Sequence, residues 1–128
     1  MTLAESTVLV VDDEPVLRMT FSALLQRMGA RVLVACDGIE ALQMQDSQRV
    51  DLILTDKQMP NMDGMTLLDR LRKRGILTPA IVFVNSVQPD DPKEMERLGV
   101  ARTVTKPIHP QDLVHMLDEV LASIASVR

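Results

Sequence analysis

Short apolar runs alternate with amphipathic stretches along the whole chain. The first run, Thr7–Val11, is rich in β-branched residues and leads into Asp-Asp-Glu-Pro, which predicts a buried strand. From Leu17 to Met28 the apolar residues recur at spacings of three and four, which predicts a helix with one apolar face. Pro15 suits the first turn of this helix, and Gly29 suits its C-terminal end.

The same alternation recurs toward the C-terminus. Further strands are predicted at Arg31–Ala35, Val50–Thr55, Ala80–Val84 and Val100–Thr105. Further helices are predicted at Gly38–Gln48, Met65–Lys73, Asp91–Leu98 and Gln111–Ile124. Strands that alternate with helices are typical of α/β proteins, so we expect a doubly wound, five-stranded parallel sheet with five helices. The most continuous apolar runs are expected at its centre, namely Val8–Val11, Leu52–Leu54 and Ala80–Val84.

Length and composition indicate one domain with an aliphatic core. With 128 residues the chain has room for a single domain, 1–128, with a core from about residue 7 to 124. Phe21 and Phe83 are the only aromatic residues, so almost nothing is available to stack on a flavin or a nucleobase. The single Cys36 cannot form an internal disulfide and is expected to be a small buried residue. Methionines are expected to fill gaps in the core, namely Met19, Met28, Met44, Met65, Met95 and Met116.

Charge and hydropathy exclude several classes of protein. The net charge of −4 argues against sequence-independent nucleic-acid binding, which needs a concentrated basic surface. No apolar run approaches the ~18 residues of a membrane span, and the first residues lack a signal-peptide pattern. We therefore expect a cytoplasmic protein that contacts neither a membrane nor nucleic acid. Exposure to solvent is expected for His109 and His115. It is also expected for a basic cluster at a helix end, for which docking of an acidic partner is the alternative: Arg70, Arg72, Lys73 and Arg74.

Charged and polar side chains follow the predicted strands. In an open parallel sheet, ligands bind beyond the carboxyl ends of the strands, so these side chains are expected at one edge. Each is unremarkable alone, since acidic turns and surface lysines are common. Together they place three carboxylates and one ammonium at the same edge, and carboxylates this close raise one another's pKa unless a cation lies among them. The residues are Asp12, Asp13, Asp56, Asn85, Ser86 and Lys106.

A hard divalent cation would relieve this repulsion. Mg2+ takes oxygen ligands and is often held by one or two carboxylates together with phosphate oxygens. Lys106 offers a mobile positive charge for a phosphate, and Asp56 is then available as a nucleophile toward phosphorus. The product would be an acyl phosphate, a labile species suited to a timed switch.

These motifs resemble the receiver domain of response regulators in two-component signalling. The resemblance rests on Val-Leu-Val-Val-Asp-Asp-Glu at 8–14, on Asp56 followed by Met-Pro-Asn-Met-Asp-Gly at 59–64, and on Lys106-Pro107, and it covers about Thr7 to Ile124. It implies a flavodoxin-like sheet with strand order 2-1-3-4-5. It also implies that Asp56 is the phosphoacceptor, that Lys106 contacts the phosphoryl group, and that the bond before Pro107 is cis. The implied ligands of Mg2+ are Asp12, Asp13, Asp56 and the main-chain carbonyl of Gln58.

Two switch positions depart from the family pattern. Receivers usually place Ser or Thr at the end of the fourth strand, where counting puts Val84. They also usually place Tyr or Phe three residues before the lysine, where this chain has Thr103. Asn85 or Ser86 could supply the missing polar group after a slip of one or two residues.

The resemblance leaves two hypotheses about function. In the first, the domain takes a phosphoryl group from a histidine kinase or phosphotransfer protein and signals to a downstream protein or a fused effector domain. In the second, it binds partners independently of phosphorylation. We expect a monomer or weak dimer that catalyses only its own phosphorylation and dephosphorylation. A phosphatase or flavodoxin is disfavoured, because Asp56-Lys57-Gln58 lacks a second acid and no Gly-rich loop follows the first strand.

Overall fold

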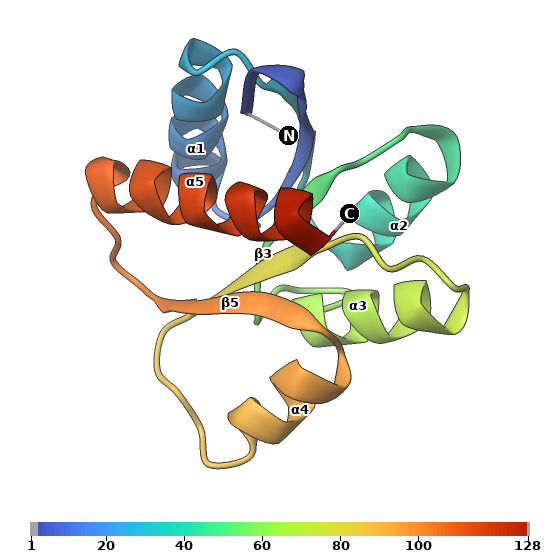
Figure 1. Ribbon diagram of the computed structural model, residues 1–128. Helices are drawn as coiled ribbons and strands as arrows, with labels where there is room; N and C mark the ends of the chain where they lie inside the picture. Colours follow the sequence, from blue (N-terminus) through green and yellow to red (C-terminus); the bar gives the residue numbers. More distant parts are fainter. Residues whose placement is uncertain (1–2, 128) are drawn as a thin grey trace.

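A parallel sheet forms the centre of the structure, a computed structural model that describes residues 3–127 and the side chains of residues 3–124. Its five strands lie in the order β2-β1-β3-β4-β5 (Figure 1), which confirms the flavodoxin-like topology. The strands are β1 (Thr7–Val11), β2 (Arg31–Ala35), β3 (Leu52–Asp56), β4 (Ala80–Val84) and β5 (Val100–Thr105). The expected central strands β1, β3 and β4 are flanked on both sides, and β2 and β5 are the edges.

Helices cover both faces of this sheet. They are α1 (Pro15–Arg27), α2 (Gly38–Ser47), α3 (Gly64–Lys73), α4 (Asp91–Arg97) and α5 (Pro110–Val127), after a short 3-10 helix, η1 (Leu3–Glu5). Pro15 opens α1, and the carboxylates of Asp37 and Asp63 accept the N–H groups of Glu40 and Thr66 as caps of α2 and α3. No helix among the described residues is long and apolar enough to cross a membrane.

Two apolar layers hold the helices against the sheet. Successive strand residues point to opposite faces, so Leu9 and Val10 of β1 enter different layers. Each fully buried aliphatic side chain contributes about 1.5–3 kcal/mol to the free energy of unfolding. The layer under α1 and α5 includes Val10, Leu25, Leu54 and Leu117. The layer under α2, α3 and α4 includes Leu9, Leu42, Ile53, Leu68 and Met95.

The element boundaries differ slightly from those predicted. The third strand begins at Leu52, two residues later than expected, because Asp51 forms two bonds to Thr7 at the strand entrance. Its main-chain N–H donates to the Thr7 carbonyl at 2.9 Å, and its carboxylate accepts the Thr7 N–H at 2.9 Å. The last helix begins at Pro110 and runs past Ile124 to Val127.

Three expectations about individual side chains were wrong. Cys36 is exposed after the edge strand β2, and its thiol donates to the Glu40 carboxylate at 3.1 Å. Met19 is 71% exposed, because it falls on the outer face of α1. Arg72 is only partly exposed, because its guanidinium donates to the carbonyls of Leu98 at 2.8 Å and Ile76 at 2.9 Å.

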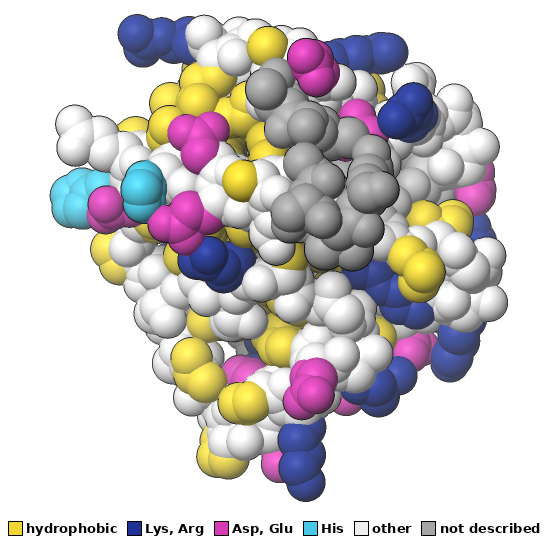
Figure 2. Space-filling model, viewed as in Figure 1, with side chains coloured by type: hydrophobic (Ala, Val, Ile, Leu, Met, Phe, Trp, Pro, Cys, Tyr) yellow, Lys and Arg dark blue, Asp and Glu magenta, His cyan; other side chains and the backbone are white. Residues whose placement is uncertain are grey.

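Other expectations about the surface and core are confirmed. Met95 and Met116 are buried, and three further methionines pack against the core, namely Met28, Met44 and Met65. His109 and His115 are exposed, and Figure 2 shows the histidine side chains beside acidic ones near the start of α5. His115 pairs with Glu119 at 2.8 Å on that helix.

Candidate functional site

Parallel pairing brings the carboxyl ends of the strands to one edge of the sheet. Val11 pairs with Thr55, so the next residues, Asp12 and Asp56, lie at the same level. The Asp12 N–H donates to the Ala35 carbonyl at 3.1 Å, which extends the ladder one residue beyond β1. The pairing of the strands therefore places Asp12 and Asp56 at the same level of the sheet, independently of their side-chain contacts.

Three carboxylates converge at this edge, as predicted. One oxygen from each of Asp12, Asp13 and Asp56 lies within 4.8 Å of the others. Asp12 is 2% exposed and Asp56 8%, whereas Asp13 is exposed. Asp12 is oriented by the N–H of Glu14, which donates to its Oδ1 at 2.8 Å. Carboxylates at the ends of β1 and β3 therefore bring their oxygens close together.

Lys106 supplies the positive charge of the site. Its main-chain N–H donates to the Val84 carbonyl at 2.8 Å, which holds it beside the end of β4. Its Nζ lies 2.6 Å from Oδ1 of Asp56 and 3.4 Å from Oδ2 of Asp12. The side chain is only 14% exposed, so this ion pair is poorly screened by water. The peptide bond to Pro107 is cis, as the resemblance implied.

Burial and like charges make Asp56 a weaker acid than usual. The pKa of its carboxyl is raised from 3.8 to about 6, chiefly by burial; the charges of Asp12 and Asp13 also raise it, and the hydrogen bond and charge of Lys106 lower it. Burial alone would lower the pKa of Lys106, but its bond to Asp56 and the charges of Asp56 and Asp12 outweigh burial and raise it. The edge therefore carries more negative charge than one lysine balances, which favours a bound cation.

A cleft of about 240 Å³ opens over these groups. Asp13, Asp56 and Lys106 line it on the strand side. Gln58, whose main-chain carbonyl was predicted as a metal ligand, also lines it. The loop after β4 contributes Asn85 and Ser86, both of which are exposed. The cleft thus brings together two of the predicted acids, Asp13 and Asp56, with the lysine and the two alternative polar groups of the switch.

Neither atypical switch position brings a polar side chain to the cleft: Val84 is apolar, and Thr103 is not among the residues that line it. Val84 is the last residue of β4, where counting placed it, and it is 2% exposed in the apolar layer under α3. Thr103 is exposed on the edge strand β5, where it pairs with Val82 in the ladder. The polar groups nearest to the strand end are therefore those of the following loop.

Sequence reasoning missed two pairs of residues around the cleft. Lys57 directly follows Asp56, and its Nζ lies 2.6 Å from Oδ1 of Asp91 at the start of α4. Asn61, at φ 67°, donates its side-chain N–H to Asp37 at 2.8 Å and so ties the loop after β3 to α2. A lysine beside the candidate nucleophile was a visible signal. Its partner 34 residues away left no sequence pattern.

Known proteins resemble this chain over most of its length. The model of the response regulator receiver domain matches residues 8–118. The Regulator of RpoS from Escherichia coli is 33% identical over 122 residues, which cover 95% of this chain but only 36% of that protein. The chain thus spans about a third of that relative's length.

Solved structures of receiver proteins superpose closely on the fold. The chemotaxis protein CheY4 of Vibrio cholerae is 32% identical with a TM-score of 0.84, over 90% of this chain and 98% of that one. The response regulator TrrA of Thermotoga maritima, solved in complex with Mg(2+)-BeF, is 25% identical with a TM-score of 0.79. That match covers 90% of this chain and 98% of TrrA.

Proposed function

The chain belongs to the response regulator receiver domain family of two-component systems, and from this premise we propose that Asp56 accepts a phosphoryl group from a phosphohistidine donor. The donor would be a histidine kinase or a phosphotransfer protein, and the output a downstream protein or a fused effector domain. The observation that carries the proposal is the convergence of Asp12, Asp13, Asp56 and Lys106 at one edge of the sheet. We expect the domain to act in the cytoplasm as a monomer or weak dimer, and to have no substrate other than its own aspartate.

The donor set at the cleft fits Mg2+. Three carboxylate oxygens within 4.8 Å of one another are hard ligands of the kind this ion prefers. Asp12, Asp13 and Asp56 would hold the ion, together with the main-chain carbonyl of Gln58. When bound, Mg2+ would neutralise charge on the phosphoryl oxygens. The site also has room for a small phosphorylated group, because the cleft has a volume of about 240 Å³.

Asp56 and Lys106 have complementary tasks in the transfer. A carboxylate oxygen of Asp56 forms the new bond to phosphorus while the P–N bond to the donor histidine breaks. The imidazole keeps the electron pair of that bond and takes up a proton. Lys106, at 2.6 Å from Oδ1 of Asp56, is close enough to contact an oxygen of the incoming phosphoryl group and balance its charge. The product is an acyl phosphate on Asp56.

Labelling with a small phosphodonor tests the proposal. Acetyl phosphate with Mg2+ should add one phosphoryl group to the wild-type chain, detected as a mass increase of the intact protein. Asp56→Asn should abolish the labelling, because the amide is not a nucleophile toward phosphorus. Lys106→Ala should slow it, because charge on the transferring group is then less well balanced. Equal labelling of Asp56→Asn would place the acceptor elsewhere.

A second candidate function is supported by the switch positions. Val84 and Thr103 lack the hydroxyl and the aromatic ring through which receivers usually transmit phosphorylation. A domain of this kind could bind partners without a phosphoryl group. The same labelling experiment distinguishes the two functions: Mg2+-dependent labelling of Asp56 supports the first, and its absence supports the second.

A further inference from the structure

A partly buried ion pair lies directly beside the candidate phosphoacceptor. Lys57 follows Asp56 in the chain, and its main-chain N–H donates to the Phe83 carbonyl of β4 at 2.8 Å. Its Nζ contacts Oδ1 of Asp91 at 2.6 Å, and the two side chains are only 20% and 9% exposed. Asp91 is the first residue of α4. The pair therefore connects the end of β3 to the loop and helix that follow β4.

Hydrogen bonds continue this connection into the loop. Oδ2 of Asp91 accepts the main-chain N–H of Gln88 at 2.7 Å, and the Asp91 N–H donates back to the Gln88 carbonyl at 3.1 Å. The side-chain amide of Gln88 then donates to the hydroxyl oxygen of Ser86 at 3.0 Å. A continuous chain of contacts thus runs from Lys57 through Asp91 and Gln88 to Ser86.

The last member of this chain is suited to contact a phosphoryl group. Ser86 and Gln88 line the same cleft as Asp56 and Lys106. A serine hydroxyl has one donor hydrogen and two acceptor lone pairs. Because the oxygen of Ser86 accepts from Gln88, its hydrogen can be donated to an oxygen in the cleft. This is the chemical group that Val84 cannot supply.

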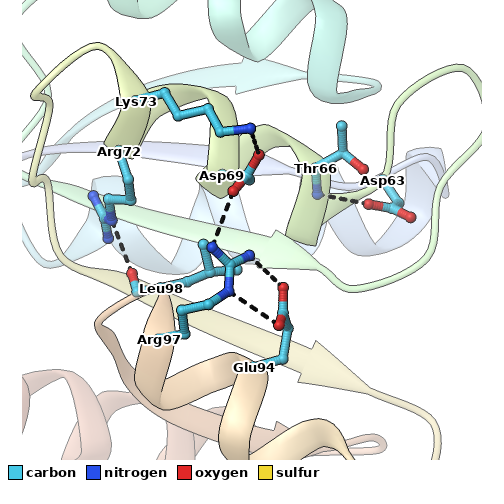
Figure 3. Close-up of polar contacts among 8 residues, drawn as sticks. All are labelled: Asp63, Thr66, Asp69, Arg72, Lys73, Glu94, Arg97 and Leu98. Atoms are coloured by element: carbon cyan, nitrogen blue, oxygen red, sulfur yellow. Dashed lines mark hydrogen bonds and ion pairs between the residues drawn. The ribbon is translucent and has the colours of Figure 1, made fainter.

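The opposite end of α4 is held by different contacts (Figure 3). Arg97 pairs with Glu94 on its own helix and reaches Asp69 of α3 at 3.2 Å, and Asp69 also pairs with Lys73. Arg72 of α3 donates to the Leu98 carbonyl. None of these six residues is among those that line the cleft. The two ends of α4 can therefore be perturbed separately.

We propose that Lys57 is a positioning residue, which holds the loop after β4 through Asp91 so that the Ser86 hydroxyl donates to a phosphoryl group on Asp56. This inference rests on the proposed function and assigns the missing hydroxyl of the switch to a residue two positions further along the chain. The ion pair at 2.6 Å ties the loop to the end of β3, so the donor is oriented before the phosphoryl group arrives. Without Lys57 the loop would have to be ordered during binding.

A double-mutant cycle on beryllofluoride binding tests this role. Beryllofluoride with Mg2+ mimics the phosphoryl group, and its affinity for the intact chain can be followed by fluorine NMR. Ser86→Ala should weaken binding about tenfold, as expected for loss of a hydrogen bond to a charged group. Lys57→Met should weaken it by a similar factor, and the double variant should be no weaker than Lys57→Met alone. Asp91→Asn, which keeps an acceptor for the Gln88 N–H, should behave like Lys57→Met.

Asp69→Asn is the matched control. It breaks the ion pairs at the other end of α4 and should leave beryllofluoride affinity unchanged. Additive effects of Ser86→Ala and Lys57→Met, or no effect of Ser86→Ala, would overturn the inference. An equal loss in Asp69→Asn would also overturn it, because general loosening of α4 would then explain the result. If wild type neither binds beryllofluoride nor is labelled by acetyl phosphate, the proposed function fails as well.

Discussion

Replacing Asp56 by asparagine is expected to stabilise the metal-free protein at neutral pH. The pKa of Asp56 rises from 3.8 to about 6 in the folded state, chiefly through burial. Each pKa unit corresponds to about 1.4 kcal/mol, so keeping this carboxylate charged costs the fold up to about 3 kcal/mol. The amide removes that charge and its repulsion from Asp12 and Asp13. Loss of the ion pair with Lys106 offsets part of this gain. We therefore expect a net gain of about 1–3 kcal/mol in the free energy of unfolding.

The gain should depend on pH with a definite sign. Because the folded state has the higher pKa, it binds more protons than the unfolded chain between about pH 4 and 6. The wild-type protein should therefore lose stability as pH rises through this range. Below about pH 4 Asp56 is protonated in both states, and wild type and Asp56→Asn should be equally stable. Above about pH 7 their difference should be constant.

Chemical and thermal unfolding in the presence of EDTA measure this difference. At pH 7.5 Asp56→Asn should melt roughly 3–10 °C higher than wild type. Asp37→Asn is a control with the opposite sign, because the Glu40 N–H and the Asn61 amide lower the pKa of Asp37. It should destabilise the protein at neutral pH, because these donors stabilise the charged form of Asp37. A melting temperature of Asp56→Asn at or below that of wild type would refute the electrostatic argument.

Three further outcomes are expected. Mg2+ at a hundredfold excess over its dissociation constant should stabilise wild type by about 2.7 kcal/mol, measured by thermal shift. Asp13→Ala should lose most of this stabilisation, and an undiminished response to Mg2+ in the variant would show that the acids do not hold the ion. Gly64→Ala should lower the free energy of unfolding in urea by about 1–3 kcal/mol, because the added Cβ would collide with the Asp56 carbonyl. The Cβ of Gly75→Ala meets no neighbour, so this variant should lose only about 1 kcal/mol for its positive φ; equal losses in the two variants would argue against the collision. Beryllofluoride should raise hydrogen-exchange protection mainly at residues 85–92. Broad protection across Val100–Lys106 and α5 would contradict this and show that a full switch operates.

The fold was largely predictable, because its signals are local. Val8–Val11 reads as a strand from its own composition, and the spacing of apolar residues after Pro15 defines a helix without reference to anything distant. The errors occur where one element meets another. Val50 was included in the third strand because it is apolar, but the strand starts only at Leu52, after Asp51 has bonded to Thr7.

The acidic cluster was predictable for a topological reason. Asp12, Asp56 and Lys106 each follow a strand, and parallel strands end at the same edge, so their convergence follows from the order of elements. The residue types then favour Mg2+ and phosphate. Cys36 shows the limit of this reasoning, because its exposure depends on β2 being an edge strand.

The sequence by itself determined the strands, the helices and the set of groups at the carboxyl edge, because periodicity and strand ends are properties of neighbouring residues. Only the tertiary structure decided how those groups are held. The pair Lys57–Asp91 joins residues 34 positions apart, and Arg72 reaches from α3 to the Leu98 carbonyl at the end of α4. Such contacts depend on where irregular loops place a side chain in space. No repeat in the sequence encodes that placement, since it arises only when the helices have packed on the sheet.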